Sequence, residues 1–266
     1  MKFLKPIIAA LFAAAATLSA SATKTLEVPL TVTPSDSAGM TIYLPDSNPS
    51  GRMIVMLPGG GYAHLAMYHE GIDWVPFFND RGIAVAVVKY RMPHGNPSVP
   101  QTDAMDAIRY IRSHASSLGV NPEDVGLMGF SAGGHLCSTV ATHAPADARP
   151  DFHILMYPVI SMEKGLSHGG SRDNLLGPNP RQSLVAEYTN SLQVDTLTPR
   201  AFIALSHDDR TVPAKNSVDY YLALLSYGIP ATMHIYPTGG HGWGIRERFQ
   251  YHDRMLDELD SWLKSF

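Results

Sequence analysis

Residues 129–133 read GFSAG, and this stretch decides how we interpret the whole sequence. The residues before it, 124–128, predict a short buried strand, and residues 132–143 have the pattern of a helix. A Gly-x-Ser-x-Gly between a strand and a helix is typical of a nucleophile elbow, a sharp turn that exposes the serine hydroxyl above the end of a sheet. Because the two glycines lack a Cβ atom, the strand and the helix can approach each other closely. We therefore predict that Ser131 is a catalytic nucleophile and not merely the cap of a helix.

The composition is that of one large domain with a full core. The chain has 266 residues, of which 45% are hydrophobic and 17% are charged. The formal net charge is -4, and no basic stripe indicates a nucleic-acid partner. Cys137 is the single cysteine, so no intrachain disulfide is possible, and we expect it to be a small core residue.

The N-terminus has the pattern of a signal peptide. Two lysines precede an apolar, alanine-rich run at residues 7–16, and Ala-Ser-Ala at residues 20–22 fits a cleavage site. The apolar run is too short to span a membrane. We predict a signal peptide at residues 1–22 and one domain at residues 23–266, secreted or periplasmic, with no membrane association after cleavage.

Strand and helix patterns alternate along the rest of the chain. Two alternating runs, 26–32 and 40–44, suit antiparallel strands. Strands are also expected at residues 53–57, 83–88, 152–157, 201–205 and 231–236, and helices at residues 71–80, 101–119, 212–227 and 249–263. This alternation predicts an α/β fold: a doubly wound, mostly parallel sheet with an antiparallel N-terminal edge.

Two segments interrupt the alternation. Residues 91–100 are rich in proline and glycine, which predicts a loop. Residues 161–199 form an irregular insert with one short helical piece near residues 184–188. An insert of this length is usually functional, so we expect it near the site.

The acid that orients a catalytic histidine is expected after a late strand, because the order in this kind of fold is serine, acid, histidine. Asp208 and Asp209 directly follow the strand at 201–205. We choose Asp209 because Asp-x-x-Val-Pro leading into a helix is the arrangement shown by proteins that share this nucleophile elbow. Asp208 is then left for another role, such as capping.

The base is expected in a loop after the last strand, where residues 239–244 read GGHGWG. The glycines allow the backbone to place the imidazole of His241 over the serine. His207 and His234 are alternatives, but both lie in or against a strand, so we expect them to be buried structural residues.

The oxyanion of an acyl-transfer intermediate needs hydrogen-bond donors. One is the backbone N–H of Ala132, which follows the nucleophile, and the others come from the PGGGY loop at residues 58–62, where we assign Gly60 and Gly61. No cofactor or metal is expected, because the sequence has no His-Glu-x-x-His and no clustered Cys/His spacing. His64, His69 and Glu70 lie close together, but we expect a solvent-exposed or capping role for them.

Together these motifs resemble the exported bacterial esterases of the acetyl xylan esterase type, α/β-hydrolases related to the hormone-sensitive lipase group. The resemblance covers nearly the whole mature chain. Its motifs are LPGGGY at residues 57–62, KYR at 89–91, GFSAGGHL at 129–136, GSRDNLLG at 170–177, DDRTVP at 208–213 and GHG at 240–242. Many relatives have histidine where Pro58 stands, so the details of this oxyanion loop are expected to differ.

The resemblance implies an enzyme that removes acetyl groups from plant polysaccharide or its oligomers, with an acetylated carbohydrate as its substrate. The insert is polar, which suits sugar hydroxyls. We expect substrate contacts from Tyr62, His168, Ser171, Arg172 and Trp243. Three alternatives stay open: a feruloyl or other short-chain esterase, a serine peptidase, and an inactive binding protein of the same fold.

Overall fold

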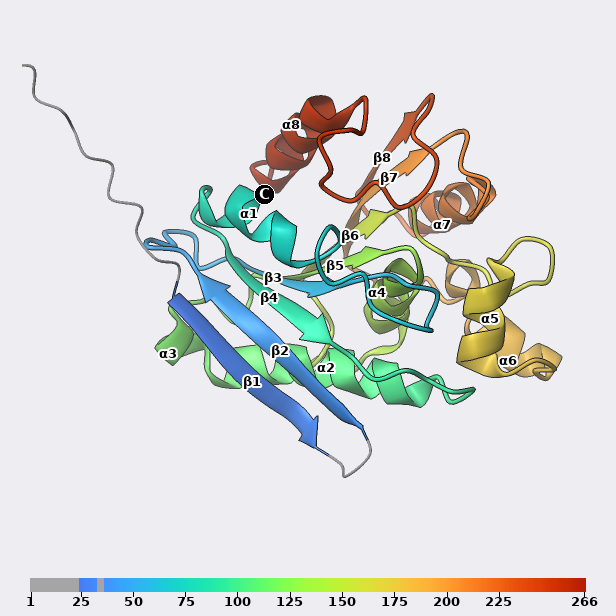
Figure 1. The fold of residues 1–266 in the computed structure, drawn as a ribbon, viewed down its shortest axis with the longest axis horizontal. Coiled ribbons are helices and arrows are strands. Elements are labelled where there is room, and N and C mark those ends of the chain that lie inside the picture. Colours follow the sequence, from blue (N-terminus) through green and yellow to red (C-terminus); the bar gives the residue numbers. More distant parts are fainter. Residues whose placement is uncertain (1–23, 33–35) are drawn as a thin grey trace, which may run out of the picture.

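The computed structural model describes residues 24–32 and 36–266, and the strands of this part of the chain form one sheet (Figure 1). Its eight strands lie in the order β1-β2-β4-β3-β5-β6-β7-β8. Their bounds are Lys24–Val32 (β1), Ser37–Leu44 (β2), Met53–Leu57 (β3), Ala84–Lys89 (β4), Val125–Phe130 (β5), Phe152–Met156 (β6), Arg200–Ser206 (β7) and Ala231–Tyr236 (β8). The doubly wound α/β sheet predicted from the sequence is confirmed.

The pairing of the strands follows their hydrophobic patterns. From β4 to β8 all neighbours pair in parallel, and β3, β5 and β6 are buried at every residue because helices cover both faces. β2 pairs antiparallel with both β1 and β4. It alternates between buried and half-buried residues, as a strand does when only one of its faces packs on the core. The predicted antiparallel N-terminal edge is therefore also confirmed.

Helices cover the sheet on both faces. In Figure 1, α1 and α8 lie above the sheet, and α2, α3 and α4 lie below it. An ion pair of 2.8 Å between Arg81 and Asp260 ties the end of α1 to α8. The bounds are Ile72–Trp74 (η1), Val75–Asn79 (α1), Ser98–Ser113 (α2), Ala115–Leu118 (α3), Ala132–His143 (α4), Gly169–Leu176 (α5), Gln182–Glu187 (α6), Asn190–Leu192 (η2), Lys215–Ser226 (α7) and His252–Leu263 (α8).

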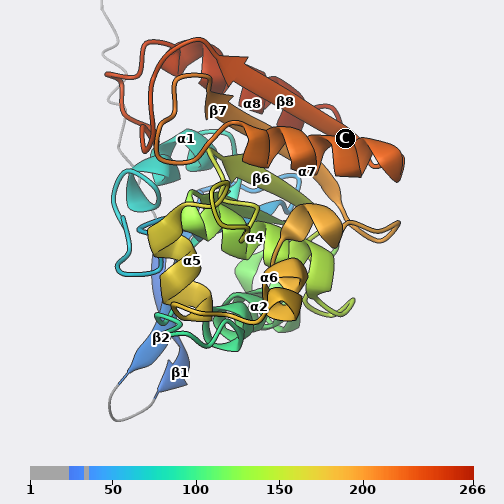
Figure 2. The ribbon, with the colours of Figure 1, turned by 90° about the vertical axis from the view of Figure 1, so that its right-hand side faces the viewer.

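The insert at residues 161–199 lies over the end of the sheet, and α5 and α6 face the viewer in Figure 2. We expected a single helical piece near residues 184–188, and this is wrong because α5 is a second helix. α5 begins with two glycines, which are poor helix formers. Its start is instead stabilised by the side chain of His168, which accepts a hydrogen bond from the backbone N–H of Ser171.

The predicted loop at residues 91–100 is also too long, since α2 already begins at Ser98. Pro100 does not prevent this, because a proline in the first turn of a helix has no N–H that the helix needs. Cys137 is buried, as expected of a core residue.

The predicted signal peptide, residues 1–22, lies outside the described residues. Within the described ranges, no helix is long and apolar enough to cross a membrane.

Candidate active site

Ser131 lies at the turn between β5 and α4, in a backbone conformation that few residues adopt. Its φ is 52° and its ψ is -117°, which is strained for a residue with a Cβ atom. The turn is held on both sides: the N–H of Ser131 donates to the carbonyl of Met156 at 3.0 Å, and the Ser131 carbonyl accepts from Val159 at 3.0 Å. A Cβ atom on Gly133 would lie 2.1 Å from the Leu57 carbonyl oxygen, so the close approach requires glycine.

Three side chains form a continuous chain of hydrogen bonds. The Ser131 Oγ lies 2.8 Å from His241 Nε2, and His241 Nδ1 lies 2.6 Å from Asp209 Oδ2. The carboxylate only accepts hydrogen bonds, so it selects the tautomer that carries its proton on Nδ1. His241 Nε2 is then free to accept the hydroxyl proton of Ser131, which is what a general base requires.

The two adjacent aspartates have different partners. The side chain of Asp209 is 1% exposed, and its second oxygen accepts the backbone N–H groups of Thr211 and Val212 at 2.8 and 2.9 Å. Asp208 is exposed, and its Oδ1 accepts the N–H of Gly240 at 2.8 Å. Asp209 therefore orients the imidazole ring, while Asp208 holds the loop that carries the ring.

The glycine-rich loop after β3 carries Gly60 and Gly61, two of the three predicted oxyanion donors. Gly60 and Gly61 have φ values of 132° and 66°, and a Cβ atom on Gly60 would lie 2.1 Å from the His64 carbonyl oxygen. In the part of the chain that the structure describes, the N–H groups of Gly60, Gly61 and Ala132 have no hydrogen-bond partner. Backbone N–H groups left free in this way are what the predicted oxyanion site requires.

Two buried side chains anchor this loop, which begins with Pro58. The hydroxyl of Tyr90 donates to the carbonyl of Pro58 at 2.6 Å, and burial raises the pKa of Tyr90, so the hydroxyl keeps its proton. Glu70 Oε2 accepts the N–H of Gly59 at 2.9 Å. The sequence analysis missed the role of Glu70: we expected it to be exposed or capping, whereas it is 3% exposed.

Glu70 also reaches the histidine loop, through Tyr157. Glu70 Oε1 accepts the Tyr157 hydroxyl at 2.8 Å, and the Tyr157 oxygen accepts the N–H of Gly244 at 2.9 Å. Burial raises the pKa of Tyr157, and the neighbouring Glu70 adds to the shift, so Tyr157 stays a donor. Its ring centroid lies 4.9 Å from that of His241. One carboxyl group thus supports both the glycine-rich loop after β3 and the loop that carries His241.

His135, in the GFSAGGHL motif, joins the same loop to the insert. Its Nε2 donates to the carbonyl of Tyr188 at 2.8 Å, because a carbonyl only accepts, and Nδ1 then accepts the Tyr62 hydroxyl at 2.9 Å. Burial lowers the pKa of His135 to about 4, so the ring is neutral at ordinary pH. Both of its nitrogen atoms are used within the fold.

The insert contacts the site mainly through α5. Asn174 Nδ2 donates to the carbonyl of Gly61 at 2.8 Å. His168 lies close enough to the catalytic group for His241 and Asp209 to act on its pKa, which is lowered chiefly by burial. A Cβ atom on Gly61 would lie 3.7 Å from the His168 ring. The N-terminal end of α5 therefore borders both the triad and the oxyanion loop.

The five residues that we expected to contact the substrate differ from one another in exposure and in their partners. His168 is half-buried at the site, with its Nδ1 2.9 Å from the Ser171 hydroxyl. Tyr62, Ser171 and Trp243 are buried, and the indole N–H of Trp243 donates to the Ser206 hydroxyl at 3.1 Å. Arg172 donates to the carbonyl of Met162 and pairs with Asp173.

The two alternative bases lie elsewhere, and our expectation that they are buried is wrong. His207 is exposed, and His234 is half-buried with its Nδ1 3.1 Å from Glu258 Oε2. Within the described residues neither forms a hydrogen bond or ion pair with Ser131. The loops that follow β7 and β8 carry Asp209 and His241 to the site instead. Among the described residues, the imidazole that reaches the serine hydroxyl comes from the glycine-rich loop after β8.

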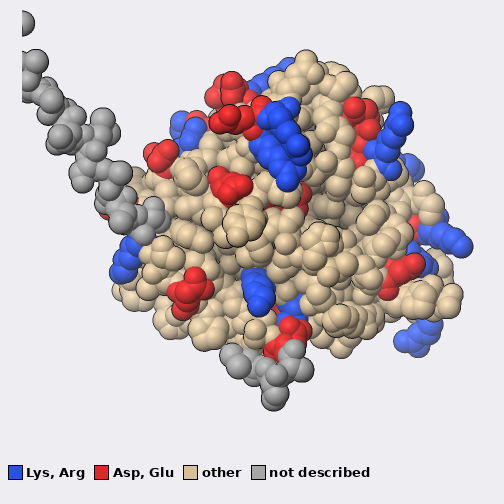
Figure 3. Space-filling view, viewed as in Figure 1, with Lys and Arg blue, Asp and Glu red and all other residues tan. Residues whose placement is uncertain are grey.

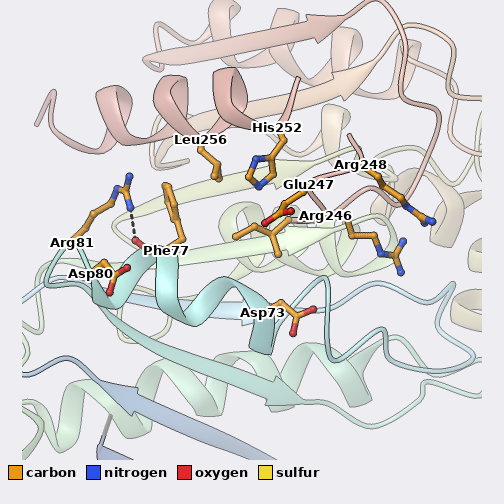
Figure 4. Close-up of a pocket in the computed structure, with 10 residues that line it drawn as sticks. Asp73, Phe77, Asp80, Arg81, Arg246, Glu247, Arg248, His252 and Leu256 are labelled. Atoms are coloured by element: carbon orange, nitrogen blue, oxygen red, sulfur yellow. Dashed lines mark hydrogen bonds between the residues drawn. The ribbon is translucent and has the colours of Figure 1, made fainter. Parts of the chain in front are cut away.

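A separate cleft of about 780 Å³ lies between α1, the residues after the histidine loop and α8 (Figure 4). Charged side chains of both signs line it, including Asp73, Arg81, Glu247 and Arg248. None of the triad residues lines this cleft. Among the described residues, no group of three or more His, Cys, Asp or Glu side chains is placed to hold a metal ion.

The sequence matches the model of one protein family and several known proteins. The model of the BD-FAE family matches residues 40–224. An acetylxylan esterase of Xylanibacter ruminicola is 45% identical over 232 residues, which are 86% of this chain and 48% of that protein. Endo-1,4-beta-xylanase B of Butyrivibrio fibrisolvens is 33% identical over 75% of this chain and 34% of its own length. The chain thus spans about half or less of these two relatives.

A solved structure matches over nearly its full length. It is an acetyl ester-xyloside bifunctional hydrolase of Caldicellulosiruptor lactoaceticus, with a TM-score of 0.83 and 34% identity over 90% of this chain and 96% of that one. The family model also covers more than half of the present sequence, including the elbow and the oxyanion loop. The chain therefore belongs to the BD-FAE family, and its fold is that of the acetyl xylan esterase-like α/β-hydrolases.

Proposed function

We propose that this protein is a serine carboxylesterase that removes acetyl groups from xylan or xylo-oligosaccharides. The single observation that carries the proposal is the hydrogen-bonded chain from Ser131 through His241 to Asp209, next to unpaired backbone N–H groups. This combination activates a hydroxyl nucleophile and stabilises the negative charge that its attack creates. The names of the two xylan-related relatives and of the acetyl ester hydrolase support the substrate class.

The reaction has two halves. Ser131 Oγ attacks the acetyl carbonyl carbon while His241 Nε2 takes the hydroxyl proton, and the carbonyl oxygen becomes an oxyanion bound by the N–H groups of Gly60, Gly61 and Ala132. Collapse of this intermediate breaks the ester bond, and His241 returns the proton to the departing sugar oxygen. The product of the first half is an acetyl ester of Ser131.

Water completes the second half. His241 takes a proton from the water molecule, whose oxygen attacks the acetyl-serine carbonyl, and the same N–H groups bind the second oxyanion. Collapse releases acetate and returns the proton to Ser131 Oγ. Asp209 stabilises the imidazolium ion in both halves, and no step uses a cofactor.

The surroundings of the site favour a small acyl group on an uncharged substrate. Long acyl chains need an extended apolar channel, whereas α5 and the loops beside it present polar groups such as His168 and Asn174. Figure 3 shows acidic and basic side chains interspersed over one face of the molecule, with no broad field of one sign. The predicted signal peptide at residues 1–22 would place this activity in the periplasm or outside the cell.

The test is acetate release from acetylated xylan and xylo-oligosaccharides, run beside p-nitrophenyl acetate, p-nitrophenyl octanoate and a feruloylated oligosaccharide. We expect acetate release by the wild type, none by Ser131→Ala, and faster turnover of the acetyl than of the octanoyl ester. A preference for the feruloylated substrate would replace the acetyl assignment. Ester hydrolysis that persists in folded Ser131→Ala would refute the nucleophile.

A further inference from the structure

A second cleft lies directly beside the oxyanion loop, and none of Ser131, Asp209 and His241 lines it. It has a volume of about 360 Å³. We call it the His94 cleft. Residues from three separate segments line it: Tyr62 and Ala63 from the oxyanion loop, Met92 and His94 from the loop after β4, and Asp173 and Asn174 from α5.

Asn174 connects the wall of this cleft to the catalytic machinery. Its side chain donates to the carbonyl of Gly61 at 2.8 Å, and its backbone carbonyl accepts the N–H of Gly95 at 2.9 Å. His168, the N-cap of α5, lies near His241 and Asp209, and the helix rises about 1.5 Å per residue, so Asn174 lies about 9 Å further along its axis. The His94 cleft therefore continues from the oxyanion loop away from the serine, within reach of a short oligosaccharide.

His94 is held in this cleft by a strained but well-anchored loop. Its φ is 47°, a conformation that is uncommon outside glycine, and the next residue, Gly95, has a φ of 83°. The start of the loop is fixed by Arg91, whose guanidinium lies 2.7 Å from the fully buried carboxylate of Asp103. Strain of this kind is frequent at ligand-binding positions, because only the surrounding structure maintains it.

The side chain of His94 is available to a ligand. It is exposed, and within residues 36–266 its imidazole has no hydrogen-bond partner. An imidazole and an amide each donate and accept, as a sugar hydroxyl does. Met92 adds apolar surface for the carbon face of a sugar ring, and the one acidic side chain, Asp173, is paired with Arg172 at 2.9 Å.

We propose that the His94 cleft binds the xylose backbone of the substrate on one side of the acetylated sugar. This inference rests on the proposed function, since it assumes that the reacting ester is carried by a neutral polysaccharide. The residues that line the cleft suit a neutral polysaccharide, because they combine polar side chains with an apolar wall. The cleft has no surplus of positive charge that would favour a polyanion. It also excludes a long-chain acyl group, which would need an enclosed apolar channel.

A neighbouring cleft of about 410 Å³ offers a matched control. It shares Asp173 and Pro178 with the His94 cleft, and Lys164, Arg172 and Asn179 line it as well. Lys164 is exposed, so its replacement by alanine should not disturb the fold. His94→Gly is a mild test variant, because glycine adopts the positive φ of this position without strain. Met92→Ala removes the apolar wall independently.

The experiment is calorimetric titration of the full-length protein with xylotetraose that carries no acetyl group. We expect binding by the wild type and by Lys164→Ala with equal affinity, and binding about five- to tenfold weaker in both His94→Gly and Met92→Ala, the loss expected for one hydrogen bond or apolar contact. Circular dichroism and the thermal midpoint check that each variant is folded.

Two results would overturn the inference. One is no change of affinity in either variant of the His94 cleft, and the other is weakening in Arg172→Ala alone, which would place the saccharide in the neighbouring cleft. The proposed function is tested separately by Ser131-dependent hydrolysis of p-nitrophenyl acetate. If p-nitrophenyl acetate is not hydrolysed while xylotetraose still binds, the proposed esterase activity is refuted. If p-nitrophenyl acetate is hydrolysed but xylotetraose does not bind, the proposed saccharide site in the His94 cleft is refuted.

Discussion

Replacing Glu70 with glutamine should slow catalysis strongly although the side chain does not touch the nucleophile. Glu70 accepts two buried hydrogen bonds, from the Gly59 N–H and from the Tyr157 hydroxyl. Glutamine has one acceptor oxygen, so its NH₂ group must face one of these two donors. One buried donor left unsatisfied costs about 1–3 kcal/mol. We therefore expect the free energy of unfolding to fall by about that amount, with the fold retained.

The effect on turnover follows from what the two donors hold. Gly59 precedes Gly60 and Gly61, and one lost oxyanion donor typically reduces kcat by about 10²–10³-fold. Glu70→Gln displaces the loop rather than deleting a donor, so we expect kcat on p-nitrophenyl acetate to fall by about 10–100-fold. KM should change little, because the oxyanion interaction develops only in the transition state.

The assay compares three measurements in purified, folded variants: kcat, KM and the inhibition constant of a boronic acid, which forms a tetrahedral adduct with the serine. Affinity for the boronic acid should fall in parallel with kcat. Tyr157→Phe, which keeps the Gly59 bond, should lose less than Glu70→Gln. The exposed Glu123 provides the matched control Glu123→Gln, which should behave as the wild type. A Glu70→Gln protein whose kcat stays within twofold of the wild type would refute this reasoning.

Three further predictions concern the triad, metals and pH. Asp209→Asn should reduce kcat by about 10⁴-fold, because an amide favours the wrong imidazole tautomer. Asp208→Asn only weakens the hydrogen bond to Gly240, so kcat should fall by about tenfold or less. Equal losses of kcat in the two variants would contradict the assignment of Asp209. Acetate release should not change after dialysis against EDTA, and a loss that zinc or calcium restores would contradict the cofactor-free mechanism. Burial lowers the pKa of His135 to about 4, below the value of about 6.5 in an unfolded chain, so the unfolded state binds more protons between these values. Stability should therefore fall as pH drops from about 6.5 to 4, and urea unfolding should show that His135→Asn removes up to about 1.4 kcal/mol per pH unit of this slope; an unchanged slope would exclude His135 as its source.

The sheet could be predicted from the sequence because its central strands are short apolar runs, as strands buried on both faces are. β3 and β8 match their predicted bounds, as does α4. The order of the elbow, the Asp-Asp pair and the GGHGWG loop along the chain was enough to nominate Ser131, Asp209 and His241. Local patterns sufficed here because each motif directly follows a strand, and the carboxyl ends of parallel strands meet at one edge of the sheet.

The supports of the site could not be predicted, because they depend on contacts between distant segments. Glu70 lies in a segment without a clear hydrophobic period, and its partner Tyr157 is 87 positions away. α5 begins with glycines and is held by a side-chain cap and by the bond of Asn174 to Gly61. Neither interaction leaves a periodic signal in the sequence.

The most direct test of the central claim is to label the nucleophile and identify the labelled residue. The wild type is treated with a p-nitrophenyl phosphonate, which mimics the tetrahedral intermediate of ester hydrolysis, and the modified peptide is mapped by mass spectrometry. The account predicts one phosphonyl group per chain, on Ser131 Oγ, with hydrolysis of p-nitrophenyl acetate lost in proportion. It predicts no label in Ser131→Ala and much slower labelling in His241→Gln. A label on another residue that accompanies loss of activity, or full activity in a protein labelled at Ser131, would contradict it.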